Sequence, residues 1–397
     1  MPSPLLEAAR AAYTQAFGLE PTILAQAPGR VELLGNHTDY NGGLVLATAI
    51  DRGTVIAGRP TPEREGQVHS TGFADPDRFD LEALEPGEPG TWGRYVRGVV
   101  WALRETHGPL QGGFQAAIAG DVPLGAGLSS SASLQAALAL FLLKAGVAGQ
   151  ATDLDDPARM ALAKLLRRGE NEFVGVQSGL LDQFSVLFGR ADMALSLDCR
   201  SLEYERLSLG TPPPAIVICD SKTSRRLADG MYNQRRAECE RVVSFFQAKR
   251  GTEAVTWLRD LTVDELEEAW SQLDTIGRIR ARHVLTENER VQQGAEALRA
   301  GDSARLGELM SDSHSSSRDD FGNSSSYLEA LIESAEEAPG YLGGKLSGAG
   351  WAGCTVNLVD AAQADDFAEA VRHHYTKRTA IVPDVHICHA AAGASEL

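Results

Sequence analysis

A glycine- and serine-rich segment, Gly120–Ser133, constrains the fold of this chain more than any other feature. It joins a strand-like apolar run, Phe114–Ile118, to a helix-like apolar run, Ser131–Leu143. Gly125 and Gly127 allow a tight turn and the close approach of a ligand, because no Cβ obstructs the backbone. The helix that follows begins with unpaired amide N–H groups at the positive end of its dipole. The segment therefore predicts a cradle for an anion.

The three consecutive serines of this segment indicate what the anion is. The hydroxyls of Ser129, Ser130 and Ser131 are available to phosphate oxygens or to Mg²⁺. No Gly-Lys-Ser/Thr ends the segment, so it is not a Walker A loop. An ordinary serine-capped helix is the alternative, but three serines after Gly-x-Gly-Leu exceed what a cap requires.

Composition places the chain among globular proteins that bind phosphate only locally. Of 397 residues, 43% are hydrophobic and 23% are charged, which is enough to bury a core without metals or crosslinks. The formal net charge of -17 repels nucleic acid and anionic membrane surfaces, so neither is expected as a partner. Any phosphate must be held by backbone amides, a few cations and a metal.

Cysteine usage and hydropathy predict a cytoplasmic protein. The five cysteines are odd in number, scattered, and form no C-x-x-C pair, which suits reduced thiols better than disulfides. Residues 1–10 show no apolar signal-peptide core, and the best apolar run, Ala136–Leu143, is too short to span a bilayer. His386 and His389 flank Cys388, but the stretch alternates like a strand, which we favour over a metal site.

Chain patterning predicts an α+β fold that divides near residue 210. Short apolar runs and turns suggest strands between Ile23 and Arg59, and a proline run at 211–214 suggests a connection. Beyond it the chain reads as largely helical, with a strand at Ala215–Asp220 and late strands near residues 345, 357 and 387. Among the expected helices are Asp229–Lys249, Val263–Gln272 and Ile279–Ala300.

Three further stretches carry groups suited to sugar and phosphate chemistry. Ala27–Gly43 crowds amide, imidazole and carboxylate groups into a turn, as sites that read ring hydroxyls do, although such residues also form ordinary turns. Gly179–Phe184 holds an acid that could be a base or a helix cap. Lys345–Thr355 is a small-residue loop in which another backbone or a phosphate comes close, or else a tight hairpin.

Together these stretches resemble the galactokinase branch of the GHMP small-molecule kinases. Ala27–Gly43 follows, with two exceptions, the signature Gly-Arg-x-Asn-x-x-Gly-Glu-His-x-Asp-Tyr. The phosphate segment matches Pro-x-Gly-Ala-Gly-Leu-Ser-Ser-Ser-Ala, and Gly179–Gln183 resembles Gly-Ile-Met-Asp-Gln. Agreement continues, in order and spacing, through Trp92–Val99, Tyr232–Cys239, Arg280–Val284, Ser313–Asp320 and Lys345–Thr355. The resemblance therefore spans nearly the whole chain.

The resemblance implies a two-domain α+β fold and a reaction. An N-terminal α/β domain, residues 1–210, would bind sugar and ATP, and a C-terminal ferredoxin-like α+β domain, residues 211–397, would complete the active site between them. The implied reaction converts galactose and ATP to galactose 1-phosphate and ADP with Mg²⁺. We expect a monomer more than an oligomer.

The resemblance also assigns roles to residues. Asp182 matches the aspartate that accepts or orients the proton of the anomeric hydroxyl, and Arg30 matches the arginine that faces the transferring phosphoryl group. Ser130 and Glu170 match the Mg²⁺ ligands, with Glu172 as a nearby alternative. The expected sugar-binding residues are Glu32, Asn36, His37, Asp39, Gly179 and Tyr232. The expected nucleotide-binding residues are Trp92, Gly125, Gly127, Leu128, Ser129, Ser130 and Ser131.

Five positions depart from the family pattern. Glu32 stands where the family has Asn, Asn36 where it has Glu, Lys345 where it has Arg, Ser178 where it has Cys, and Gln135 where it has Glu. Residues four apart in a strand share a face, so we hypothesise that Glu32 and Asn36 lie close together as a compensated exchange. The amide of Asn36 would not repel a uronic acid as a carboxylate does, so galacturonate stays open as a substrate beside galactose. N-acetylgalactosamine is a further alternative.

Two rival functions would share this fold or its phosphate segment. A catalytically silent sugar sensor would keep this fold, but Arg30, Asp182 and the triple serine are all present. A mevalonate or homoserine kinase would share the phosphate segment without the His-Thr-Asp-Tyr turn. The basic pairs Arg225–Arg226 and Arg235–Arg236 have acids close by in the sequence, which favours a solvated helix face over a ligand site.

Overall fold

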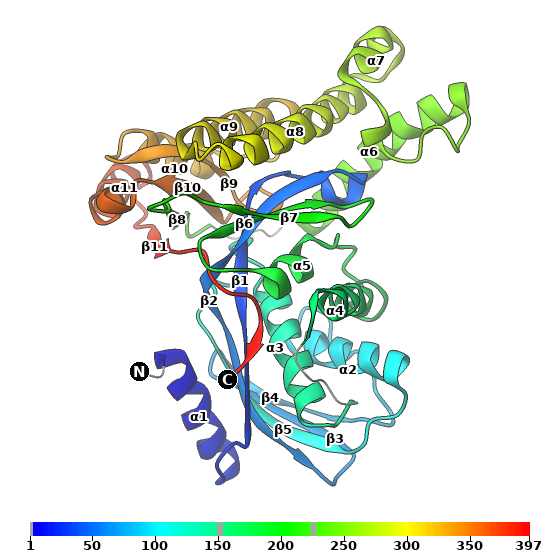
Figure 1. The fold of residues 1–397 in the computed structure, drawn as a ribbon, viewed down its shortest axis with the longest axis vertical. Helices are drawn as coiled ribbons and strands as arrows, with labels where there is room; N and C mark the ends of the chain where they lie inside the picture. The colour runs from blue at the N-terminus through cyan, green and yellow to red at the C-terminus, as the bar shows by residue number, and fades with distance from the viewer. Residues whose placement is uncertain (1–2, 149–153, 224–227) are drawn as a thin grey trace.

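The computed structural model of the chain describes residues 3–148, 154–223 and 228–397, and it contains two β-sheets (Figure 1). The first sheet has the order β12-β1-β2-β5-β3-β4, and β6 and β7 extend it beside the first half of β2. Only β3 and β5 pair in parallel. The strands of this sheet are β1 (Ile23–Leu34), β2 (Leu44–Thr61), β3 (Glu65–Ser70), β4 (Phe73–Asp80), β5 (Gly113–Gly120), β6 (Met193–Asp198), β7 (Tyr204–Ser208) and β12 (Ser395–Glu396).

Helices cover both faces of the first sheet. One face packs against α2 (Gly93–His107), α3 (Ser130–Lys144), α4 (Asp156–Arg168) and α5 (Leu181–Phe188), and their apolar side chains form the largest core cluster. On the other face lies α1 (Pro4–Phe17), which packs on β2 and β5 through a small core that includes Tyr13 (Figure 1). Because helices cover both faces of the sheet, the turn between β5 and α3 lies at the end of the sheet.

The second sheet has the ferredoxin-like topology that the sequence predicts. Its antiparallel order is β11-β8-β10-β9, and helices separate β8 from β9 and β10 from β11, which gives the chain order β-α-β-β-α-β. The strands are β8 (Ala215–Asp220), β9 (Tyr341–Leu346), β10 (Cys354–Val359) and β11 (Asp384–Cys388). The helices are α6 (Ala228–Arg250), α7 (Val263–Glu268), α8 (Thr275–Arg299), α9 (Ser303–Ser316), α10 (Ser326–Glu336) and α11 (Ala364–Thr379).

A shared apolar core joins the two sheets. Val31 and Leu33 of β1 belong to the same buried cluster as Ile218 of β8 and Val356 of β10. The chain passes from one sheet to the other between Ser208 and Ala215, yet β12 returns to pair with β1 at the C-terminal end. The division into independent domains near residue 210 stays a prediction.

Short helical turns occur where the sequence changes direction. Those at Gly169–Val174 and Ser317–Phe321 are π-helical, and both continue a preceding α-helix. The others are 3₁₀ turns at Asp39–Asn41, Leu258–Asp260, Trp270–Gln272 and Ala361–Gln363. Single-turn π-bulges inside helices recur at functional sites, so these two segments are candidates for functional side chains.

Two expectations about the helical half need correction. The expected helix Val263–Gln272 breaks at Ala269, where α7 gives way to a 3₁₀ turn. Arg235 is not on a solvated face: it is buried, its guanidinium pairs with Glu238 at 3.0 Å, and it donates to the carbonyl of Phe321. Arg225 and Arg226 lie outside the described residues.

Two remaining expectations concern strands and membranes. The stretch around Cys388 forms β11, as its alternating pattern predicts. Across residues 3–148, 154–223 and 228–397, no helix combines the length and the hydropathy needed to cross a bilayer.

Candidate active site

The glycine- and serine-rich segment forms a turn between β5 and α3. Gly125 and Gly127 both take left-handed conformations, with φ of 71° and 74°, and Ser129 at the start of α3 does so with φ of 57°. The Ser129 side chain makes no capping hydrogen bond, and within the described residues its buried Oγ has no partner. A buried hydroxyl without a partner is costly, so this geometry favours a ligand that supplies one. The helix opening fits a phosphate group.

A second loop touches the phosphate segment at backbone level. A Cβ added at Gly127 would lie 3.0 Å from the carbonyl oxygen of Ser347, and one at Gly348 would lie 3.0 Å from the Cα of Gly127. The Ser347 hydroxyl also donates to the carbonyl of Gly127 at 3.2 Å. The small residues at 347–350 are therefore needed because another backbone passes there, rather than for a simple hairpin turn.

Arg30 and Asp182, 152 residues apart in sequence, meet beside this segment. Oδ1 of Asp182 accepts from Nε of Arg30 at 2.9 Å and from Nη2 at 2.6 Å, while Oδ2 takes part in neither contact. Nη1 of Arg30 donates to the carbonyl of Gly127 at 2.5 Å. Arg30 is buried and Asp182 is 29% exposed. The arginine thus joins the phosphate segment to a carboxylate with one free oxygen.

Asp39 lies close to the same carboxylate. Loss of solvation, together with repulsion from Glu32 and Asp182, raises the pKa of Asp39 to about 7. Gly179 packs directly against it, since a Cβ at Gly179 would lie 1.9 Å from Oδ2 of Asp39. Only glycine at 179 leaves room for this carboxylate. Three acids therefore face one small region, and an ionised Asp39 there needs a partner.

Aromatic rings form one wall of this region. The His37 ring stacks on Phe321 with centroids 4.3 Å apart, and Tyr232 lies 5.5 Å away. Nδ1 of His37 accepts from the Tyr40 hydroxyl at 2.9 Å, and Nε2 donates to the carbonyl of Ala349 at 3.3 Å. Burial lowers the pKa of His37 to about 3, so the ring is neutral. Both ring nitrogens are engaged within the protein.

The amide of Asn36 ties three segments together. Its Nδ2 donates to the carbonyl of Gly348 at 2.8 Å, and its Oδ1 accepts from Asn323 at 3.0 Å and Ser317 at 3.3 Å. One N–H of this amide is left for a further acceptor, since an amide carries two donors. Asn36 therefore holds the predicted sugar-binding turn at residues 35–43 (the sugar turn) against the 347–350 loop.

The expected strand geometry of Glu32 and Asn36 is wrong. Strand β1 ends at Leu34, a register shift interrupts it between Glu32 and Leu34, and Gly35 turns the chain with φ of 108°. The two residues therefore do not share a strand face. Among the described contacts, no hydrogen bond joins them. Their compensated exchange stays a hypothesis.

Glu32 instead pairs with a residue that sequence reasoning did not connect to it. Nζ of Lys345 donates to Oε1 of Glu32 at 2.7 Å, and both side chains are buried. The pairing could have been suspected, because both positions depart from the family pattern and carry opposite charges. Nothing in the sequence sets their separation, however, since they lie 313 residues apart.

Helix α8 clamps the sugar turn, which sequence reasoning also missed. Oε1 of Glu287 accepts from the amides of Gly35 at 2.8 Å and Asn36 at 3.1 Å. One turn earlier, Nε2 of His283 donates to the carbonyl of Asn36 at 3.0 Å. These residues stand four apart, so both project from one face of the helix. Together they fix the backbone at Gly35 and Asn36.

Glu170 has the environment of a metal ligand. It lies on the π-helical turn after α4, and its Oε2 accepts from Ser178 at 2.5 Å and Gln183 at 2.7 Å. Burial raises the pKa of Glu170. A cation would favour its charged form, and Oε1 takes part in neither of these bonds. Glu172, the alternative ligand, is exposed and pairs with Arg168.

The donor set fits Mg²⁺ more than a metal held by protein alone. In the described residues no three His, Cys, Asp or Glu side chains gather as a metal cluster. Mg²⁺ typically binds one or two protein oxygens together with substrate phosphates and waters. Glu170 and a hydroxyl at Ser130, the first residue of α3, suit that pattern.

Trp92 lies beside an exposed aromatic ring. Its indole stacks on Phe73 with centroids 5.7 Å apart, at the start of α2 and of β4. Because Ser70 pairs both with Phe73 and with Ile118, this pair sits at the end of the sheet where β5 leads into the phosphate segment. Stacked rings at that edge suit a planar base.

Comparison with known proteins identifies the class of protein first. Models described as the N-terminal and C-terminal domains of GHMP kinases match residues 94–190 and 295–377. A mevalonate kinase crystal structure, 16% identical, superposes with a TM-score of 0.63 over 93% of this chain and 99% of the other, which shows the fold alone. With the phosphate segment at a helix start, fold and site define a GHMP-type small-molecule kinase.

The particular branch follows from closer relatives. The model described as the galactokinase galactose-binding signature matches residues 11–60. Galactokinase from a Roseiflexus species is 41% identical over 97% of this chain and 95% of the relative, and human galactokinase is 40% identical over 94% and 92%. Lactococcus lactis galactokinase, crystallised with galactose, superposes with a TM-score of 0.91 at 30% identity over 99% and 100%. The chain belongs to the galactokinase family.

Proposed function

We propose that this galactokinase-family enzyme transfers the γ-phosphoryl group of ATP to the anomeric hydroxyl of galactose. The observation that carries the proposal is the Arg30–Asp182 pair, which places a guanidinium and a free carboxylate oxygen beside the phosphate segment. Phosphoryl transfer is mostly positioning and charge neutralisation, and this pair supplies both. The free Oδ2 of Asp182 accepts or orients the proton of the sugar hydroxyl.

The remaining site residues divide between sugar and nucleotide. Asp39 accepts hydrogen bonds from sugar hydroxyls, with Tyr232 beside it and Gly179 leaving the space that its carboxylate needs. His37, Asn36 and Glu32 shape the wall through their own protein contacts. The nucleotide phosphates rest on the amides and hydroxyls of the phosphate segment, and the adenine stacks at Trp92. The phosphate-segment residues are Gly125, Gly127, Leu128, Ser129, Ser130 and Ser131.

Mg²⁺ completes this proposal. Ser130 and Glu170 would hold the ion, and when bound it would neutralise charge on the nucleotide phosphates. Ser178 and Gln183 hold the Glu170 carboxylate in place through its Oε2. Arg30 neutralises the developing charge from the other side of the phosphate segment.

Charge in the pocket favours a neutral sugar over a uronic acid. Three carboxylates, Glu32, Asp39 and Asp182, interact electrostatically there. Among the described residues, Arg30 pairs with Asp182 and Lys345 pairs with Glu32, and no further ion pair is formed with the three. A substrate carboxylate would add a fourth acid to this region. Galactose is therefore the proposed substrate, ahead of galacturonate and N-acetylgalactosamine.

The test is a sugar panel assayed by coupled ADP release with MgATP. We expect the highest kcat/KM for galactose and a loss of activity when Mg²⁺ is chelated. Equal or better use of galacturonate would overturn the choice of sugar. Absence of ADP release with every sugar, while galactose still binds, would mean that the protein is a sugar sensor.

Solution state and location complete the proposal. We propose a cytoplasmic monomer, since the chain is strongly acidic and all five cysteines are free thiols, four of them buried. Reduced cysteines suit the cytosol. Light scattering of the purified protein would test the monomer.

A further inference from the structure

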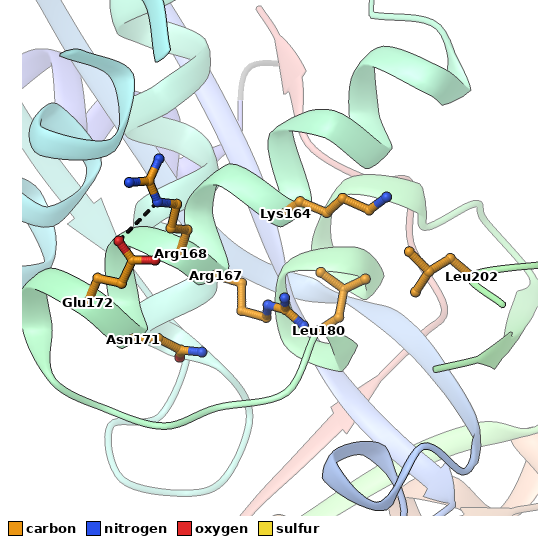
Figure 2. A pocket seen from close by; sticks show the side chains of 7 residues that line it. All are labelled: Lys164, Arg167, Arg168, Asn171, Glu172, Leu180 and Leu202. Carbon is orange, nitrogen blue, oxygen red and sulfur yellow. Dashed lines mark hydrogen bonds and ion pairs between the residues drawn. The ribbon is translucent and has the colours of Figure 1, made fainter. Parts of the chain in front are cut away.

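A cavity of about 340 Å³ lies against α4 and gathers basic side chains in this acidic protein. Three cations, Lys164, Arg167 and Arg168, and one acid, Glu172, line it, together with the amide of Asn171 and the apolar side chains of Leu180 and Leu202. Figure 2 shows Arg167 in projection between Asn171 and Leu180, with Lys164 extending toward Leu202. Of the active-site residues described above, the cavity contains only Glu172, the alternative metal ligand, in its lining.

The protein balances only part of the positive charge in this cavity. Arg168 pairs with Glu172 at 3.0 Å, as the dashed line in Figure 2 shows, but within the described ranges no carboxylate pairs with Lys164 or Arg167. On the helix, Lys164 has Arg167 and Arg168 three and four residues ahead, where like charges repel. The helix dipole accounts for cations in the last turn, but Lys164 lies outside that turn. Two positive charges therefore remain available to an anion.

We propose that this cavity binds a phosphate monoester, such as a sugar phosphate. A phosphate ester carries close to two negative charges at neutral pH, which matches the two unpaired cations. A cavity of about 340 Å³ is at the small end of ligand pockets and is too large for a phosphate ion alone. Leu180, Leu202 and the Asn171 amide give the organic part of the ester apolar and hydrogen-bonding contacts.

The cavity adjoins residues 171–180, which connect Glu170 to Asp182. A ligand in the cavity therefore bears on the proposed function. Oδ1 of Asn171 accepts from the amide of Ser178 at 3.1 Å, and Ser178 in turn donates to Glu170. Leu180 stands two residues before Asp182. An ester held between Asn171 and Leu180 therefore contacts both ends of residues 171–180 and restrains them. This regulatory consequence rests on the roles proposed for Glu170 and Asp182, whereas binding itself does not.

The test is calorimetric titration with galactose 1-phosphate as the probe and inorganic phosphate as a second arm. The catalytic cleft is filled beforehand with galactose, Mg²⁺ and a non-hydrolysable ATP analogue. We expect one ester site, weakened at least about tenfold in Lys164→Gln/Arg167→Gln, because two charge-assisted hydrogen bonds are lost. The control Arg10→Gln/Lys377→Gln removes the same charge elsewhere and should bind within about twofold of the native protein.

Each outcome of this titration is informative. No binding, or equal binding by the double variant, overturns the site. Inorganic phosphate binding as tightly as the ester overturns the role given to Leu180 and Leu202. Amide hydrogen exchange of residues 171–180 should slow on ester binding in the native protein and the control but not in the double variant. Because binding is read without turnover, an inactive kinase that binds the ester would sink only the proposed function.

Discussion

Glu32 and Lys345 form a buried ion pair that joins the two sheets of the protein. Nζ of Lys345 lies 2.7 Å from Oε1 of Glu32, and the lysine side chain is 0% exposed. Glu32 belongs to β1 of the first sheet and Lys345 to β9 of the second. Both residues depart from the galactokinase-branch pattern described above. The contact therefore places the two departures side by side in the fold.

Lys345→Met should destabilise the protein strongly. Removing one partner of a buried pair leaves a charge without compensation, which typically costs about 3–5 kcal/mol. Glu32 would be that charge, since the structure gives its carboxylate no other side-chain cation. Urea unfolding followed by circular dichroism measures the loss.

A double variant and an exposed pair provide the controls for this prediction. Glu32→Gln/Lys345→Met removes both charges and should recover part of the stability. Lys222→Met breaks an exposed pair with Asp384 and should cost less than about 1 kcal/mol. A Lys345→Met loss no larger than that of Lys222→Met would show that the buried pair contributes little.

Galactose affinity should increase with pH through the titration of Asp39. Its pKa is raised to about 7, and only the ionised carboxylate accepts hydrogen bonds with both oxygens. The galactose KM should therefore fall between about pH 6 and pH 8. In Asp39→Asn the KM should be higher and this pH dependence should vanish, while Asp312→Asn, an exposed control, should behave like the native protein.

The same titration should act on stability with the opposite sign. Between the ordinary aspartate pKa of 3.8 and the raised pKa of about 7, the folded protein holds a proton that the unfolded chain has released. The contribution of Asp39 to stability therefore falls as pH rises across that window. Thermal unfolding at pH 8 should show Asp39→Asn to be more stable than the native protein. A lower melting temperature for this variant at pH 8 would contradict the raised pKa.

Local signals made the phosphate segment and its flanking elements predictable. Glycines mark the turn, the strand-like run before it is β5, and the apolar run after it is α3, so strand, turn and helix follow from neighbouring residues. Individual strands of the second sheet, such as Ala215–Asp220, likewise follow from continuous patterns, whereas its ferredoxin-like order was implied only by the family resemblance. Helix α1 also carries a local signal, because Ser3 caps it and Pro4 opens it.

Contacts between distant residues were not predictable from one sequence. Glu287 lies 252 residues from Gly35, and no local pattern on α8 says which turn its carboxylate meets. The sign and spacing of the charges on that helix are equally compatible with a solvated face. The shared strand face expected of Glu32 and Asn36 was wrong for a related reason, since a register shift and a glycine turn end the strand before Asn36.

Glu287→Gln should loosen the sugar turn. The buried carboxylate accepts from two backbone amides, the Ser313 hydroxyl at 2.7 Å and Arg290 at 2.6 Å. An amide in its place would turn an N–H toward one of these donors and leave Arg290 unpaired. We expect a loss of about 3–5 kcal/mol, as for other broken buried pairs, and a higher galactose KM with a smaller change in kcat.

The control for Glu287 lies on the same helix. Glu289 is exposed two residues away, and Glu289→Gln should match the native protein in both readouts. The difference in stability between the two variants should also depend on pH, because interactions with Arg290, His283 and Lys345 lower the pKa of Glu287 to about 2. The stabilisation by ionised Glu287 is present above the ordinary glutamate pKa of 4.5 and is lost as pH falls toward 2. Unequal KM values without unequal stability would contradict this account.

Asp182→Asn should separate catalysis from binding. Its Oδ1 can still accept from Arg30, so the pair and the phosphate segment keep their geometry, but an amide cannot take the proton of the sugar hydroxyl. We expect kcat to fall by ~10²–10⁴, the usual range for general base catalysis, with galactose and nucleotide affinities within severalfold by calorimetry. Asp366→Asn is the matched control, because Asp366 is an exposed residue of α11. Turnover at the native rate would mean that another group handles the proton, whereas a large loss of galactose affinity would make Asp182 a binding residue.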